Sequence, residues 1–241
     1  MRILGIDLSS QPENTAVCEL IWPDDGNIEV SYIFLGCSDD KLDELVKESD
    51  VVGIDAPFGW PTAFRYAVAG WTSQRWDCEE IQKSLRLRTT DLAVRERGHK
   101  APLSVSSERI ALPAMRAMAL LLRHEVTDKI GDKKFFEVYP AGSLACWGLP
   151  CSGYKKGEKS RDLREKILNG IRDLLPELDL DEKFAENDHY LDALVAAITA
   201  KMASIGQTEK PGDLQKDAAK EEGWIHLPSK ESVELRRRSL K

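Results

Sequence analysis

The chain has 241 residues, of which 42% are hydrophobic and 31% charged, and its formal net charge at pH 7 is -7. These values are typical of a soluble globular protein of one or two domains, and the acidic balance argues against a protein that coats nucleic acid or anionic membrane through its overall charge. Because no apolar run approaches the roughly 20 residues that span a bilayer and no signal-peptide pattern precedes the first strand, we expect a cytoplasmic protein without membrane association. An odd number of cysteines without a C-x-x-C pair indicates reduced thiols rather than a disulfide or zinc framework; they are Cys18, Cys37, Cys78, Cys146 and Cys151.

The first quarter of the chain is predicted to form three strands, a helix and a fourth strand. The strands are expected over residues 3–7, 15–22, 28–35 and 51–55. Residues 23–26 (PDDG) are typical of a turn, so the second and third strands are expected to form an antiparallel hairpin. Residues 39–49 have the spacing of a short amphipathic helix. Residues 51–55 (VVGID) form a continuous apolar run, which is typical of a buried parallel strand.

The remainder of the chain combines an irregular insertion with clearer elements. Residues 56–106 are expected to form short helices and loops. A helix is predicted from Pro113 to about Ile130, before Gly131, with an apolar face made of Met115, Met118, Leu122 and Val126. The later predicted elements are a strand over 134–140, helices over 160–175 and 188–205, and a short edge strand over 224–228. We interpret residues 1–228 as a single domain with an insertion and helix at 56–131, followed by a basic C-terminal tail at 229–241. This order favours a mixed sheet with helices on its faces.

Two of the apolar strands end in an aspartate, Asp7 in ILGID and Asp55 in VVGID. Ligands of open α/β sheets bind at the carboxyl ends of the strands, and neighbouring parallel strands lie about 4.8 Å apart. If these strands are parallel neighbours, their carboxylates converge, and a divalent cation or a shared proton has to offset the repulsion. The alternative for each aspartate is a helix N-cap or an Asx-turn, which the serines after Asp7 favour.

The last predicted helix adds two acids. Asp188 and Asp192 are four residues apart and lie on one face of the helix. Asp188 is equally interpretable as an N-cap. Asp192 stands inside an apolar run, where the small side chains of Ala196 and Thr199 allow a close approach to the sheet.

The remaining candidates are less well defined. Glu137, among the aromatic residues of strand 134–140, either faces water at an edge or points into the site. All four histidines are interpreted as surface or core residues, and the side chain of His189 points about 100° away from that of Asp188 around the helix. The side chains that can line a cleft beside the acids are Tyr139, Tyr154, Lys155 and Lys156.

Residues 83–100 (KSLRLRTTDLAVRERGHK) reverse the charge of the chain. They contain six basic and two acidic residues, a net charge of +4 in a chain of -7. Basic residues near aromatic ones suit a phosphate backbone and unstacked bases, and Trp60, Trp71 and Trp76 lie just upstream. The alternative is a solvated helix face and core tryptophans. We predict nucleic-acid contacts from Arg86, Arg88, Arg95, Arg97 and Lys100, and Asp91 can also reach the acidic site.

Several separated motifs resemble a known family. GIDLSS, GIDAPFGWP, RLRTTD, FFEVYPAGSL and DHYLDALVAAITA are together similar to the DUF429 family over about residues 1–228. That family is described as predicted nucleases of ribonuclease H-like fold, and the D-x-x-x-D helix also resembles that of Holliday-junction resolvases, whose acid spacing can differ. The resemblance implies an α/β fold with a mixed five-stranded sheet of order 3-2-1-4-5, flanked by helices, with strands 1, 4 and 5 parallel and strand 2 antiparallel.

The resemblance also implies a chemistry, namely two-metal hydrolysis of a phosphodiester in DNA or RNA, with Mg²⁺ or Mn²⁺ as cofactor. It implies that Asp7 bridges the ions and that Asp55 and Asp192 bind one ion each. Asp188 or Glu137 would complete the ligand shell. Hard oxygen ligands suit such ions.

Two other functions remain open. Actin-like ATPases also have a first strand that runs into an aspartate and a hydroxyl-bearing turn like GIDLSS, but they need a duplicated domain and a second glycine-rich phosphate loop, which this chain lacks. A non-catalytic module that binds nucleic acid or protein on the same fold is the other alternative, because fold does not determine function.

Overall fold

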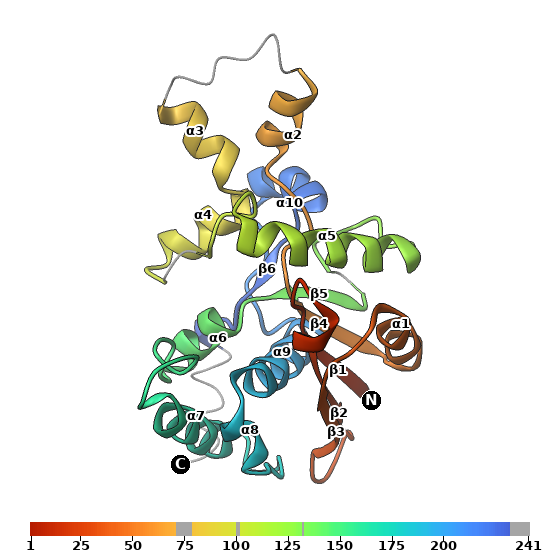
Figure 1. The fold of residues 1–241 in the computed structure, drawn as a ribbon, viewed down its shortest axis with the longest axis vertical. Coiled ribbons are helices and arrows are strands. Elements are labelled where there is room, and N and C mark those ends of the chain that lie inside the picture. The colour runs from red at the N-terminus through yellow and green to blue at the C-terminus, as the bar shows by residue number, and fades with distance from the viewer. Residues whose placement is uncertain (71–78, 100–101, 132, 232–241) are drawn as a thin grey trace.

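The computed structural model describes residues 1–70, 79–99, 102–131 and 133–231. Six strands form one sheet of order β3-β2-β1-β4-β5-β6 (Figure 1). Their bounds are β1 Arg2–Asp7, β2 Ala16–Ile21, β3 Glu29–Leu35, β4 Val51–Asp55, β5 Phe135–Val138 and β6 Ile225–His226.

The pairing of the strands confirms the predicted topology. β1, β4 and β5 are parallel to one another, β2 is antiparallel to β1 and β3, and β6 adds a parallel edge strand beside β5. The architecture is that of a ribonuclease H-like fold, extended by β6. In the register of β1 with β4, Asp7 lies directly opposite Asp55.

Helices cover both faces of the sheet (Figure 1). α9 packs across β1, β2 and β4, and together with α6, α7 and α8 it closes one hydrophobic core. α1 and α5 close a second core on the opposite face. The bounds of these helices are α1 Asp39–Glu48, α5 Glu108–Arg123, α6 Pro140–Trp147, α7 Ser160–Leu174, α8 Lys183–Glu186 and α9 Asp188–Ser204. Helices α1, α7 and α9 agree with the prediction within a residue or two. Helix α6 was not predicted, and it begins at Pro140, the last residue of the predicted strand 134–140.

The insertion between β4 and β5 contains short helices, as expected. They are α2 Thr62–Ala69, α3 Glu79–Arg86 and α4 Thr89–Glu96. Figure 1 shows α2 and α3 projecting from the rest of the molecule. α10 (Lys216–Glu222), which follows the short 3₁₀ turn Asp213–Gln215, packs against α2 and α4. A second 3₁₀ turn, Pro12–Asn14, joins β1 to β2.

The prediction for α5 was wrong in both its bounds and its buried face. The helix begins five residues before Pro113, after Ser107, and ends at Arg123. Its buried side is formed by Pro113, Ala114, Ala117, Leu120 and Leu121, whereas Met115 is 55% and Leu122 is 78% exposed. The buried side combines two alanines with two leucines, and Ala117, Leu120 and Leu121 belong to the second hydrophobic core.

Within the described part of the chain, no helix has both the length and the apolar character needed to cross a membrane. Cys18 and Cys37 are buried free thiols, and Cys146 and Cys151 are partly buried free thiols.

Candidate metal centre

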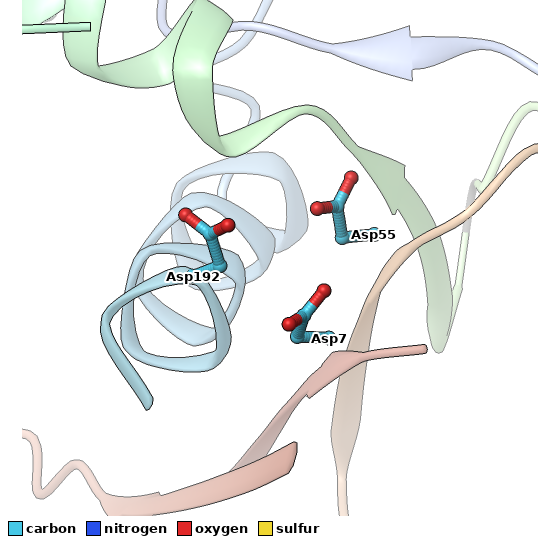
Figure 2. Close-up of side chains that lie close together, drawn as sticks. All are labelled: Asp7, Asp55 and Asp192. Atoms are coloured by element: carbon cyan, nitrogen blue, oxygen red, sulfur yellow. The ribbon is translucent and has the colours of Figure 1, made fainter. Parts of the chain in front are cut away.

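Three carboxylates converge at the carboxyl ends of β1 and β4. One carboxylate oxygen from each of Asp7, Asp55 and Asp192 lies within 4.8 Å of the other two. Figure 2 shows the three side chains close together in one region, two from adjacent strands and one from α9. The parallel pairing of β1 with β4 and the crossing of α9 therefore bring together acids that are 48 and 137 residues apart in the chain.

A repeated G-x-D pattern explains why the helix comes so close. Gly5 and Gly53 precede Asp7 and Asp55 by two residues, so each glycine shares a sheet face with its aspartate. A Cβ at either glycine would lie closer than 3.0 Å to a backbone carbonyl oxygen of α9. The facing side of the helix is alanine-rich and buried. The two glycines thus let α9 lie directly on the strands, and this close contact places Asp192 beside the strand-end acids.

Asp7 is oriented by a histidine that the sequence analysis treated as structural. His189 Nδ1 lies 2.6 Å from Asp7 Oδ2 and donates a hydrogen bond to it. This hydrogen bond and the attraction to Asp7 raise the pKa of His189, although burial opposes the shift. The side chain of Asp7 is 13% exposed, so its carboxylate is held in place while part of it remains accessible to solvent.

Asp192 is fully buried and has two partners from one loop. The Tyr154 hydroxyl donates to Asp192 Oδ1 over 2.9 Å, and Lys155 Nζ lies 2.6 Å from Asp192 Oδ2. The lysine contact is an ion pair. Burial raises the pKa of Asp192 to about 6, with Asp7 adding to the shift and Lys155 opposing it.

Asp55 is the least compensated of the three acids. Among the described residues, none donates a hydrogen bond to its carboxylate. Burial raises its pKa well above the ordinary value, Lys155 counteracts the shift, and Asp7 and Asp192 increase it. A nearby cation stabilises the ionised form of such a carboxylate.

The donor set fits a hard divalent cation. Such ions take oxygen ligands, and two oxygens on opposite sides of one Mg²⁺ are about 4.2 Å apart, from metal–oxygen distances near 2.1 Å. A spread of at most 4.8 Å is therefore close to that of a ligand set, and two adjacent ions accommodate it equally well. The three aspartates can hold a metal ion, with Asp7 and Asp192 pre-oriented by their hydrogen-bond donors.

Glu137 and Arg88 were both predicted as functional residues, and the structure places them in a different cluster. Glu137 is 2% and Arg88 1% exposed, and their side chains form two contacts of 2.7 and 2.9 Å. Arg88 also pairs with Asp91 over 2.9 Å. Arg88 is therefore not available to a phosphate backbone, and neither Glu137 nor Asp91 joins the triad. Instead, Glu137 Oε2 accepts a hydrogen bond from Phe58 N, which fixes the loop that follows Asp55.

The other predicted residues remain at the surface or outside the described residues. Asp188 is partly buried in the first turn of α9, whose N-cap is Asn187, and the structure does not bring it into the triad. Arg86 and Arg95 are exposed, and Arg97 pairs with Glu209 over 3.4 Å at the surface. Of the residues named in the sequence analysis, those outside the described part of the chain are Trp71, Trp76, Cys78, Lys100 and most of the tail at 229–241.

Two contacts of the site were missed or underrated from the sequence. His189 was assigned to the surface or the core, and Lys155 was one of four side chains expected only to line the cleft. The available signals were local. His189 lies in the first turn of α9, two residues after the N-cap Asn187. Lys155 follows the buried Tyr154 in a glycine-containing loop. Neither signal identifies the partner, which comes from a distant part of the chain.

Comparisons with known proteins identify a family and assign no chemistry to it. No curated protein and no solved structure matches the chain significantly. The family model described as "Protein of unknown function (DUF429)" matches residues 5–216, which include all three aspartates and nearly the whole sheet. The chain therefore belongs to the DUF429 family.

Proposed function

We propose that this protein is a divalent-metal-dependent nuclease that hydrolyses phosphodiester bonds. The observation that carries the proposal is the convergence of three carboxylates within 4.8 Å at the carboxyl ends of β1 and β4. Burying a carboxylate such as Asp192 costs free energy even when Tyr154 and Lys155 contact it. Such a buried acid with a shifted pKa is therefore a candidate functional residue.

The chain's own residues supply binding and orientation. Asp7, Asp55 and Asp192 would hold Mg²⁺ or Mn²⁺, in a site for two ions that activate water and stabilise the leaving oxygen when bound. His189 holds the Asp7 carboxylate in one orientation through its 2.6 Å hydrogen bond. Tyr154 does the same for Asp192. Asp188, one turn before Asp192, is the nearest acid on α9 to assist from outside the triad.

The exposed arginines of α3 and α4 support nucleic acid as the substrate. Arg86, Arg95 and Arg97 lie at the surface of an insertion that begins directly after the Asp55 strand. Local positive charge attracts a phosphate backbone even when the whole chain is acidic. The actin-like alternative is disfavoured because the described residues form one sheet and not two related halves.

The test is hydrolysis of labelled single-stranded, duplex and branched DNA and RNA with Mg²⁺ or Mn²⁺, with a chelator as blank. We expect Asp7→Asn and Asp192→Asn each to lower the rate at least about a hundredfold, equivalent to about 2.7 kcal/mol of transition-state stabilisation. Asp188→Asn tests whether this acid belongs to the site. Unchanged metal-dependent cleavage by both Asp7→Asn and Asp192→Asn would refute the proposal. ATP binding detected by calorimetry would favour the alternative, a phosphotransferase of the actin-like ATPase type.

A further inference from the structure

Lys155 pairs with one acid of the candidate metal centre and is attracted by the other two. It lies in the loop between α6 and α7, and its Nζ is 2.6 Å from Asp192 Oδ2. Burial lowers the pKa of Lys155, but attraction to Asp192, Asp55 and Asp7 outweighs burial and raises it. The ammonium is therefore a cation held by the same carboxylates that would bind a metal ion.

The loop is anchored next to Lys155 but not through it. Tyr154 is buried, its hydroxyl donates to Asp192, and its carbonyl oxygen accepts a 2.6 Å hydrogen bond from Arg164 Nη1. Gly153 and Gly157 flank the pair with φ of +77° and +110°, a conformation that other residues adopt only with strain. The backbone is thus fixed, whereas the Lys155 side chain is 50% exposed. Its flexible stem can swing the charge into solvent without unpacking the core.

We propose that Lys155 is an internal counter-ion that competes with divalent cations for the Asp7, Asp55 and Asp192 carboxylates. This inference rests on the metal site of the proposed function but not on hydrolysis. An ion bound to Asp192 Oδ2 and an ammonium 2.6 Å from the same atom would be like charges in contact, so binding of one displaces the other. Lys155 thereby raises the concentration of metal that is needed to load the site.

The size of the effect follows from the fraction of molecules that can accept an ion. If Lys155 engages the carboxylates nine-tenths of the time, the apparent Kd for the ion is on the order of tenfold higher than without the lysine. At a pH where the three acids are ionised, removing the ammonium also makes the site more negative, which acts in the same direction. Both contributions predict tighter metal binding when the ammonium is removed.

The experiment is titration of the full chain with Mn²⁺, followed by isothermal calorimetry and by the electron paramagnetic resonance signal of free Mn²⁺. We expect Lys155→Met to bind Mn²⁺ about tenfold more tightly than wild type and Lys155→Arg to return toward wild-type affinity. The matched control is Lys156→Met, at the adjacent exposed lysine, which we expect to leave Kd unchanged. Asp192→Asn identifies which binding belongs to this site.

The same variants have a second readout, which is thermal unfolding without and with Mn²⁺. In chelator, Lys155→Met should unfold at lower temperature than wild type, because the acids lose their counter-ion, and saturating Mn²⁺ should close that gap. Equal or weaker Mn²⁺ binding by Lys155→Met, with wild type still binding at this site, would overturn the role of Lys155 and leave the nuclease proposal intact. If neither protein binds Mn²⁺ at a site that Asp192→Asn abolishes, both proposals fail.

Discussion

Asp55→Asn removes one negative charge from the three-acid cluster while keeping the shape of the side chain. Asp55 receives no hydrogen bond from the described residues, so the substitution breaks no specific contact there. Its charge is repelled by Asp7 and Asp192. We therefore expect Asp55→Asn to be more stable than wild type in the presence of a chelator, which is unusual for a substitution in a buried region.

The magnitude follows from Coulomb's law. Two unit charges at the upper separation of 4.8 Å repel by about 3.5 kcal/mol at an effective dielectric constant of about 20. Asp55 has two such neighbours, and the Lys155 ammonium offsets part of the repulsion. Partial protonation reduces the net value further, so we expect a gain of about 1–3 kcal/mol, or about 2–12 °C in Tm for a domain of this size.

The pH dependence of stability gives an independent test of the sign of this change in unfolding free energy. The pKa of Asp55 is raised in the folded protein, so between the unfolded and folded pKa values the folded state binds more protons. The free energy of unfolding of wild type therefore decreases as pH rises through this window and levels off above the folded pKa. The amide side chain of the Asp55→Asn variant has no proton to lose in this range. The advantage of the variant should be small at pH 4 and larger at pH 8.

The assay is urea unfolding in chelator at both pH values, followed by circular dichroism. Asp188→Asn is the matched control, since that acid lies outside the triad, and we expect a small loss of stability because an acid near the helix N-terminus is favourable. Mn²⁺ should reverse the order, because wild type keeps a ligand that Asp55→Asn lacks. A variant that is less stable than wild type at pH 8 in chelator would refute the idea that the three acids repel one another.

Three other substitutions test the contacts around the site. Gly5→Ala should lower the free energy of unfolding by about 3 kcal/mol or more, because its Cβ would collide with the backbone of α9. Glu137→Gln should cost about 3 kcal/mol, because it breaks a fully buried ion pair with Arg88. Tyr154→Phe should cost about 1–2 kcal/mol and weaken Mn²⁺ binding, because a buried carboxylate oxygen loses its donor. Denaturant unfolding measures the stability of all three variants. Calorimetric titration with Mn²⁺ measures the metal affinity of Tyr154→Phe.

Each of these variants has a matched control at an exposed position. Gly212→Ala adds a Cβ with no neighbour closer than 3.5 Å, and Glu209→Gln removes an ion pair at the surface, worth about 1 kcal/mol or less. Tyr66→Phe removes a hydroxyl from a side chain that is 66% exposed. If a buried substitution costs no more than its control, the contact assigned to it does not contribute to stability.

The strands and their acids were predictable because the signal is local. An apolar run that ends in Asp7 or Asp55 indicates a buried strand with a polar end. The parallel pairing of these two strands was implied by the family resemblance, and the structure confirms it. Asp192 was predictable for a similar reason, since a carboxylate inside the apolar face of a helix is expensive unless it has a partner. The G-x-D repeat could have strengthened this prediction, because both glycines lie on the face that carries the acids.

The amino-acid sequence by itself identified the strands, the last long helix and the three acids, and the resemblance of its motifs to the DUF429 family implied the strand order 3-2-1-4-5. Only the tertiary structure decided the partners of each charge: Arg88 is buried against Glu137, while His189 and Lys155 contact the acids. The physical reason is that periodicity and strand composition record whether a side chain faces the interior. The partner it meets there depends on the packing of segments that are distant in the chain.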